Sequence, residues 1–239
     1  MTRRLVIVNA DDFGLGPEVN EGVLRAHADG IVTSASLMVR GASAEPAVAA
    51  ARGHPRLGLG LHLDLAEWEC RDGEWRALYS LADLDDPAAV AAEAECQLRR
   101  FRELVGRDPG HLDSHQHVHR NEPVRGVMTA MARRLGVPLR HHGLVRYRGD
   151  FYGQGRDGVP LPGAITSESL ALLLAALPEG ITEVCCHPAA GAPAGSAYSS
   201  ERALELVALC DPRVVMAAKD AGLHLVTFGE ALAGRSQAG

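Results

Sequence analysis

The sequence predicts an α/β fold, an irregular single-domain (β/α) barrel of about seven strands. Short apolar runs alternate with helical patterns along the whole 239-residue chain, which is typical of a parallel sheet covered by helices. No linker, repeat or change in composition divides the chain, so residues 1–239 are expected to form one domain. No Gly-rich dinucleotide-binding motif follows the first apolar run, and this favours a closed or nearly closed barrel over an open sheet.

Seven segments are predicted as strands because they are short, apolar and bounded by turn residues. They cover residues 4–9, 33–39, 57–65, 111–115, 137–142, 181–187 and 224–228. Two other segments, 66–86 and 145–163, are predicted as irregular loops.

Helical patterns fill most of the intervals between these strands. Pro17 in a first turn and Gly30 at a stop mark the first helix, and Asp86 as a cap and Gly106 as a stop mark the longest. The predicted helices cover residues 17–30, 43–53, 86–106, 122–136 and 167–180, with two more between 200 and 221.

Charge and composition exclude several classes of partner. A net charge of -6 and an isoelectric point near 6.0 argue against nucleic acid and anionic membranes, which require a basic surface. No apolar run has the length of a membrane span, and the N-terminal one is too short for a signal peptide. Five cysteines without a C-x-x-C pair indicate neither a disulfide framework nor a thiolate zinc site. A cytoplasmic location is therefore expected.

Polar residues with metal-binding or catalytic chemistry stand at the ends of several predicted strands. In a parallel barrel these ends meet at one rim, where side chains from different strands can reach the same ion or substrate. The residues in these positions are Asp11, Asp12, His62, His115, Arg140 and His187.

Each of these residues has a structural alternative when it is taken alone. The pair Asp11 and Asp12 could form a turn or a helix cap, and His62 could be a hydrogen-bonded core or rim residue that is not a metal ligand. The segment 111–119 (HLDSHQHVH) holds four of the chain's 11 histidines. One aspartate and two histidines suit zinc and tolerate magnesium, manganese, cobalt or nickel. The second aspartate could then accept a proton from an attacking water.

Five motifs, taken in order, give the chain a specific resemblance. NADDFGL, GIVTSASLMV, GLGLHLDL, HLDSHQHVH and CCHPA together resemble the YdjC-like carbohydrate deacetylases, over residues 5 to about 228. The resemblance implies an irregular barrel related to the polysaccharide deacetylases. It also implies hydrolytic removal of acetyl from an N-acetylated sugar, with one divalent metal ion as cofactor.

The resemblance also implies roles for individual residues. Asp11 corresponds to the catalytic base, whereas Asp12, His62 and His115 correspond to the metal ligands. His187 is similar to the late histidine near the leaving group and is assigned as general acid, with a structural role at the turn before Pro188 as the alternative.

Supporting roles are expected for a further group of residues. Asp113 is expected to orient a histidine, and His117 and His119 to contact the substrate or the ligands. Arg140 is expected either to polarise the carbonyl or to pair with Asp11, and a structural salt bridge is the alternative. Substrate contacts are expected in segments 66–86 and 145–163, from the aromatic residues Trp68, Tyr147, Phe151 and Tyr152, unless these segments pack on themselves as a lid.

Two alternatives to the deacetylase interpretation stay open. One is another metal-dependent hydrolase, an ester deacetylase or a phosphoesterase, acting at the same rim. The other is a non-catalytic carbohydrate-binding protein, although such a protein would have no need of the base Asp11. Similar proteins suggest a homodimer, but no segment of the sequence is identified as its interface.

Overall fold

The structure is a computed structural model that describes residues 3–71, 73–155, 157–193, 196 and 198–233. Its centre is a curled sheet of seven strands in the order β6-β3-β2-β1-β8-β7, with β9 beside β1. Every pair of neighbouring strands in this sheet is parallel. The bounds are β1 (Arg4–Phe13), β2 (Ser34–Leu37), β3 (Gly58–Leu63), β6 (Leu112–Ser114), β7 (Arg146–Arg148), β8 (Gly180–Cys186) and β9 (Leu223–Leu225).

β1 is the organising strand, because it pairs with three others. Its N-terminal part pairs with β9, its C-terminal part pairs with β2, and β8 follows it from Arg4 to Ala10. The residues of β1 are almost all buried, which is expected of a parallel strand covered on both faces. The carboxyl end of β1, where the site lies, is therefore held from both sides.

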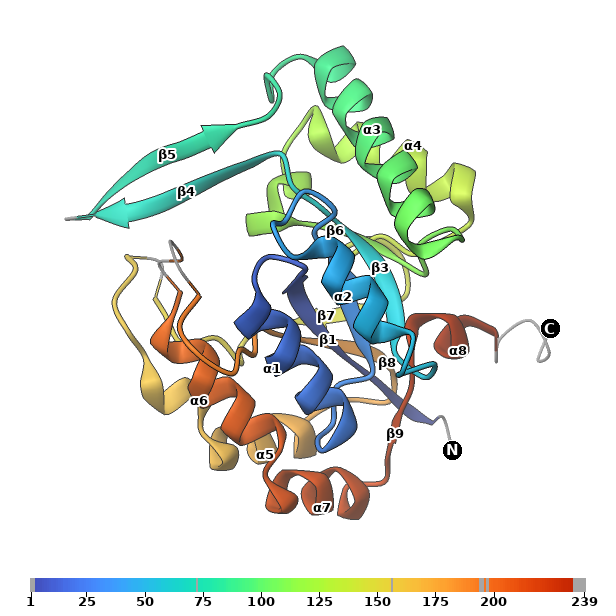
Figure 1. Ribbon diagram of the computed structural model, residues 1–239. Coiled ribbons are helices and arrows are strands. Elements are labelled where there is room, and N and C mark those ends of the chain that lie inside the picture. The colour runs from blue at the N-terminus through green and yellow to red at the C-terminus, as the bar shows by residue number, and fades with distance from the viewer. Residues whose placement is uncertain (1–2, 72, 156, 194–195, 197, 234–239) are drawn as a thin grey trace.

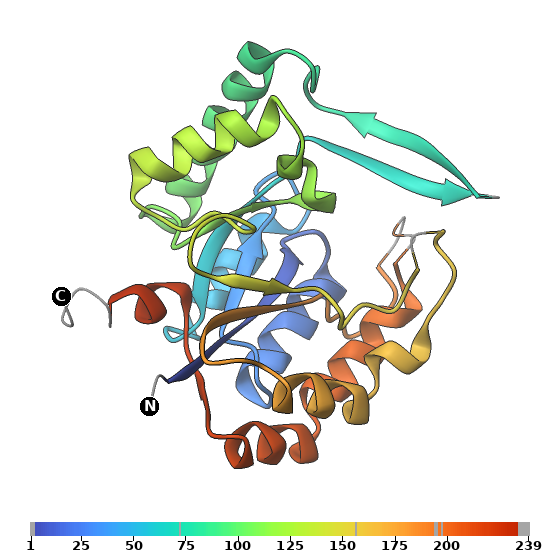
Figure 2. The ribbon, with the colours of Figure 1, turned by 180° about the vertical axis from the view of Figure 1, so that it is seen from behind.

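Helices form a continuous layer around the sheet (Figure 1, and from behind in Figure 2). Successive contacts join them in the order α4-α3-α2-α1-α6-α5-α7. Their bounds are α1 (Pro17–Ala28), α2 (Ala44–Ala51), α3 (Pro87–Val105), α4 (Val124–Leu135), α5 (Ser167–Ala175), α6 (Ser200–Leu209) and α7 (Pro212–Asp220). All seven predicted helices are present. The Asp86 side chain accepts a hydrogen bond from Ala88 N, and Gly106 ends α3 with a φ of 80°.

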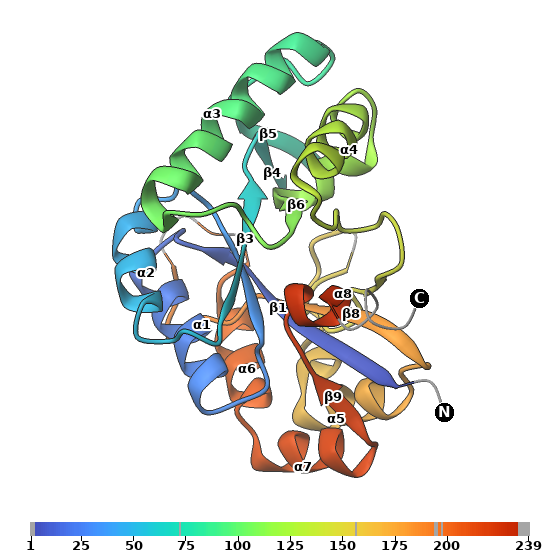
Figure 3. The same ribbon diagram turned by 90° about the vertical axis from the view of Figure 1, so that its right-hand side faces the viewer.

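The parallel, helix-covered architecture is confirmed, but the sheet does not close. Within the described part of the chain, β6 and β7 stand at opposite edges of the sheet and do not pair. Figure 3 shows β3 and β6 on one side of β1 and β8 on the other. The predicted strand 137–142 would have lain between them. Only Leu139 in it forms an isolated bridge, to Leu112, and His141 has a φ of 64° that interrupts an extended path. The structure is therefore an incomplete barrel.

Two predictions about the loops were wrong. Segment 66–86 contains an antiparallel hairpin of β4 (Ala66–Arg71) and β5 (Glu74–Ser80), which projects from the body of the molecule in Figure 1. Its sequence carries an Asp-Gly pair at 72–73, a strong hairpin signal between two segments that mix apolar and polar residues. Segment 145–163 contributes the edge strand β7.

Smaller elements complete the chain. A kinked 3₁₀ segment η1 (His115–Arg120) follows β6 directly, and a second one, η2 (Pro162–Ile165), precedes α5. The predicted strand 224–228 is shorter than expected, since Phe228 already begins the short helix α8 (Phe228–Ala233). No helix in the described ranges is both long enough and apolar enough to cross a membrane.

Candidate active site

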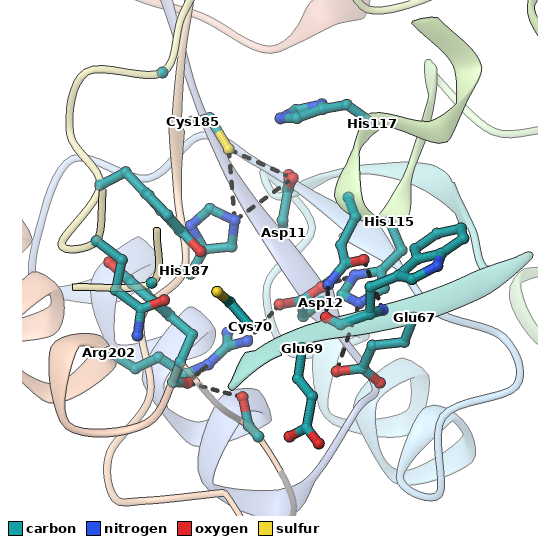
Figure 4. Close-up of a pocket in the computed structure, with 18 of the residues that line it drawn as sticks. Asp11, Asp12, Glu67, Glu69, Cys70, His115, His117, Cys185, His187 and Arg202 are labelled. Atoms are coloured by element: carbon teal, nitrogen blue, oxygen red, sulfur yellow. Dashed lines mark hydrogen bonds and ion pairs between the residues drawn. The ribbon is translucent and has the colours of Figure 1, made fainter. Parts of the chain in front are cut away.

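The carboxyl ends of four strands meet around one cavity of about 530 Å³ (Figure 4). Asp11 and Asp12 come from β1, His62 from β3, His115 from the residue after β6, and His187 from the residue after β8. All five line the cavity. The convergence that the positions of these residues predicted is therefore present.

A bulge in β1 explains how adjacent aspartates serve one site. Neighbouring residues of a regular strand point to opposite faces of the sheet. Here the register of β1 against β2 shifts between Ala10 and Phe13, and Asp12 has a φ of 64°. Bulges re-aim side chains in this way, and they are frequent next to active sites. Both carboxylates therefore reach the cavity.

Asp12, His62 and His115 form a group suited to a divalent ion. Asp12 Oδ1 lies 3.3 Å from His62 Nε2 and 3.1 Å from His115 Nδ1, and one ligand atom of each residue lies within 4.8 Å of the others. An aspartate oxygen and two imidazole nitrogens are a suitable donor set for zinc.

The surroundings of these three residues orient their ligand atoms. Asp113 Oδ1 binds His62 Nδ1 at 2.7 Å, so His62 Nε2 faces Asp12. That buried Nε2 atom has no hydrogen-bond partner among the described residues, as expected of an atom reserved for an ion. Arg202 Nη2 donates to Asp12 Oδ2 at 2.6 Å, which leaves Oδ1 facing the histidines. The contacts of Asp113 and Arg202 therefore orient the ligand atoms as a bound divalent ion would require.

Asp11 is held by an arginine instead of by the histidines. Arg140 donates to both of its oxygens, at 2.6 and 2.7 Å, and Asn9 Nδ2 donates to Oδ1 at 2.8 Å. Burial opposes ionisation of Asp11, but the Arg140 guanidinium outweighs burial and lowers the pKa of this carboxyl. Asp11 is therefore ionised at neutral pH and can accept a proton.

Arg140 is the centre of a buried charge network behind the cavity. Its side chain is fully buried, and besides Asp11 it pairs with Asp113 at 3.0 Å and with Glu183 at 2.6 Å. Three carboxylates around one guanidinium leave an excess of negative charge. The pKa of Glu183 is raised to about 7, mainly because burial disfavours its charged form. Arg140 lowers this pKa, and the nearby carboxylates Asp113 and Asp11 raise it further. The network links β1, β6 and β8 to segment 137–142.

His187 stands on the side of Asp11 away from the Asp12 group (Figure 4). Its Nε2 atom is 3.9 Å from Asp11 Oδ2, and its Nδ1 atom is 3.8 Å from Oε1 of the buried Glu205. Its backbone N–H donates to Glu205, and the rings of Tyr152 and Tyr198 flank its imidazole. The ring is thus fixed with one nitrogen facing Asp11.

The remaining predicted site residues divide into two groups. The aromatic residues and one histidine line the cavity, namely Trp68, His117, Tyr147, Phe151 and Tyr152. Asp113, His119 and Arg140 are buried behind it. The buried position of His119 excludes the substrate contact considered for it, because its ring binds Ser114 Oγ and the Arg140 carbonyl instead.

Sequence reasoning missed four charged residues of the site, of which Glu67, 4.0 Å from His115 Nε2, lies in segment 66–86. Glu183 offered a signal, since a charge inside the apolar run 181–187 is unusual in a buried strand. Arg202 and Glu205 offered none. They lie on α6, 190 residues or more after Asp12 in the chain, on a helix that looks like an ordinary amphipathic one.

Fold and site together define an α/β protein whose hydrolase-like centre sits at the carboxyl ends of parallel strands. The family of YdjC-like proteins matches residues 5–220, and this chain belongs to it. It is 34% identical to the carbohydrate deacetylase of Geobacillus stearothermophilus, covering 95% of this chain and 98% of that one. It is 35% identical to the chitooligosaccharide deacetylase of Klebsiella pneumoniae, covering 94% and 98%.

Solved structures show the same architecture. A candidate cellobiose-phosphate cleavage protein from Enterococcus faecalis superposes with a TM-score of 0.79 at 25% identity, covering 96% of this chain and 99% of that one. A family 4 carbohydrate esterase from Streptomyces lividans gives a TM-score of 0.56 at 12% identity, covering 93% and 92%. The second similarity concerns the fold alone, and it places the incomplete barrel among the polysaccharide deacetylase folds.

Proposed function

We propose that this protein is a metal-dependent carbohydrate deacetylase that removes acetyl from the nitrogen of an N-acetylated sugar. The observation that carries the proposal is the division of labour within the pair at the end of β1. Asp12 faces two histidines, whereas its neighbour Asp11 is held by Arg140 and faces His187. The activity named for relatives at 34–35% identity supports the same reaction.

Asp12, His62 and His115 would hold the ion, for which zinc is the best match to the donor set. A bound ion of this kind polarises a carbonyl and stabilises the negative charge that develops on its oxygen. Asp113 and Arg202 act through the ligands, because each holds one of them in its orientation.

Asp11 and His187 move the protons of the reaction. Asp11, kept ionised by Arg140, takes a proton from the water whose oxygen attacks the acetyl carbon. The C–N bond then breaks, and His187 gives a proton to the departing sugar amine, so that acetate and a free amine are formed. Glu205 accepts the hydrogen bond of the His187 backbone N–H, and its Oε1 atom faces the other ring nitrogen, Nδ1, at 3.8 Å.

Sugar binding is assigned to the aromatic walls of the cavity. Trp68, Tyr147 and Tyr152 line a space of about 530 Å³, which matches the volume of small-molecule sites. Acetyl sugars have apolar faces that pack on such rings, and their hydroxyls can reach Glu67 and Gln154 in the same wall.

The experiment that tests the proposal is acetate release by chelator-treated protein, resupplied with zinc or another divalent ion. The panel contains N-acetylated mono- and oligosaccharides, matched O-acetyl esters and sugar phosphates. Metal-restored release from an N-acetyl sugar is expected. Release only from esters or phosphates would support a different hydrolase, and tight sugar binding without turnover would support a binding protein.

A further inference from the structure

A second group of metal-capable side chains lies outside the Asp12 site. His117, His119 and His141 each offer one nitrogen, and these atoms lie within 4.8 Å of one another. The ring centroids are 5.1 Å apart for His117 and His141, 5.5 Å for His119 and His141, and 6.1 Å for His117 and His119. We call these three residues the tri-histidine cluster.

Hydrogen bonds fix two of the rings from outside the cluster. Tyr147 Oη lies 3.1 Å from His117 Nε2, and Ser114 Oγ lies 2.6 Å from His119 Nδ1. Metal-binding histidines typically use their second nitrogen in this way, for a hydrogen bond that sets the orientation of the ring. The other nitrogen of His117, Nδ1, is then available inside the cluster, and that of His119, Nε2, faces the Arg140 carbonyl.

Two nitrogens of the cluster are buried without a partner. His117 Nδ1 and His141 Nε2 have no hydrogen-bond partner among the described residues. His119 Nε2 has only the Arg140 carbonyl, at 3.2 Å. A buried polar atom without a partner costs about 1–3 kcal/mol, so two in one cluster indicate a binding partner such as an ion.

The backbone gives an independent indication. Four described residues other than glycine have a positive φ, and they are Asp12, Gln116, His117 and His141. Two of the four belong to the tri-histidine cluster, and a third is a ligand of the proposed catalytic ion. Such conformations cost about 1–3 kcal/mol each and cluster at functional sites. The backbone is therefore bent to aim these histidines.

The local charge is compatible with a cation. Arg140 and Arg120 are positive groups beside the cluster, and of these Arg140 is paired with Asp11, Asp113 and Glu183. Arg140 and its three carboxylate partners together carry a net negative charge when the carboxylates are ionised. This charge lowers the electrostatic cost of binding a divalent ion nearby.

We propose that the tri-histidine cluster binds a second divalent transition-metal ion of the zinc class, through one nitrogen each of His117, His119 and His141. Three imidazoles are an established protein ligand set for zinc. The ion would join η1 to segment 137–142, at the edge where the sheet stays open. The ion would thereby hold segment 137–142 against η1 and so fix the position of Arg140. Because Arg140 binds Asp11, the ion would also help to position this base.

Metal content of the full chain tests this inference. Chelator-treated protein is resupplied with Co²⁺ or Zn²⁺, desalted, and analysed for bound metal per chain, together with the visible absorption of Co²⁺. His62→Ala removes a ligand of the catalytic site, and His141→Asn removes a cluster ligand while tolerating the positive φ. The exposed His224→Ala is the matched control.

Wild type and His224→Ala are expected to bind roughly two equivalents of metal. His62→Ala and His141→Asn should each bind roughly one, and the double variant that combines these two substitutions should bind none. If His141→Asn does not fold, as judged by circular dichroism, His117→Asn replaces it, because the φ of 55° at His117 also favours Asn. Absence of bound metal in folded His62→Ala, or two equivalents retained by the cluster variant, would overturn the inference. The Co²⁺ spectrum of His62→Ala, which reports the cluster alone, separates this result from any failure of the catalytic site.

Discussion

The conformation of Asp12 decides what the first strand can do. With regular strand geometry, only one of Asp11 and Asp12 would face the cavity. The bulge at this point, with a φ of 64° at Asp12, brings both to it. Different partners then separate their roles, since Arg202 and two histidines contact Asp12 while Arg140 and Asn9 hold Asp11.

Asp113 supports the metal ligand His62, so its replacement should weaken metal binding without removing a ligand. Asp113→Asn is expected to lower zinc affinity by about 10- to 100-fold, because the 2.7 Å bond that orients the ring loses its charge. A competition titration with a chelating dye measures this affinity.

Glu183→Gln is the matched control for Asp113→Asn. This substitution also removes a carboxylate that pairs with Arg140, but the Glu183 side chain does not contact His62. Equal loss of affinity in both variants would assign the effect to the charge network instead of to the orientation of His62.

Glu183 should also make stability depend on pH. Its pKa in the folded protein is about 7, above the ordinary 4.5, mainly because of burial. The stabilisation from this group is full below about pH 4.5 and is lost as the pH rises through about 7, because the unfolded chain ionises more easily. Wild type should therefore lose on the order of 1–3 kcal/mol relative to Glu183→Gln between pH 5 and pH 8.5. Urea unfolding at both pH values measures the difference, and a constant difference would contradict the assignment.

At the scale of elements, the β4–β5 hairpin shows how one side chain positions a whole arm. Gln116 accepts a hydrogen bond from Trp68 N at 2.9 Å and donates one to Trp68 O at 2.7 Å, as a neighbouring strand would. Both tryptophans of the chain, Trp68 and Trp75, lie on this hairpin and line the cavity. Gln116 thus couples the wall of the cavity to η1.

Shortening this side chain should loosen the arm without disturbing the fold. Gln116→Asn tolerates the φ of 48° at this position but cannot span the same two bonds. The amide of Trp68 is expected to exchange hydrogen faster, and KM for the sugar to rise with a smaller change in kcat. Hydrogen exchange and steady-state kinetics measure both. Unchanged exchange at Trp68 would show that the strand pairing alone holds the hairpin.

The sequence predicted elements well where local signals were strong. Several helices carry a cap or a stop of their own, as Asp86 and Gly106 do for α3, and the long strands are apolar runs. The hairpin was missed although an Asp-Gly pair marks it. Segment 137–142 looked like a strand, but the conformation of His141 depends on tertiary contacts that no local pattern records.

At the scale of the whole molecule, the Arg140 side chain can reach the active site because the sheet stays open at its edge. Segment 137–142 leaves the sheet after a single bridge to β6, and this brings the Arg140 side chain under β1 and β8. The order of motifs along the chain was sufficient to predict the rim and its residues. It could not show that Arg202 and Glu205 from α6 complete the site, because those contacts arise only when the helix layer closes on the sheet.

The central claim is that adjacent aspartates do different work, and one paired measurement tests it most directly. Acetate release and bound metal are measured on the same preparations of wild type, Asp11→Asn and Asp12→Asn. Asp11→Asn should keep its metal and lose at least about 100-fold in turnover, whereas Asp12→Asn should lose both. Near-normal turnover in Asp11→Asn, or loss of metal from it equal to that from Asp12→Asn, would contradict the account.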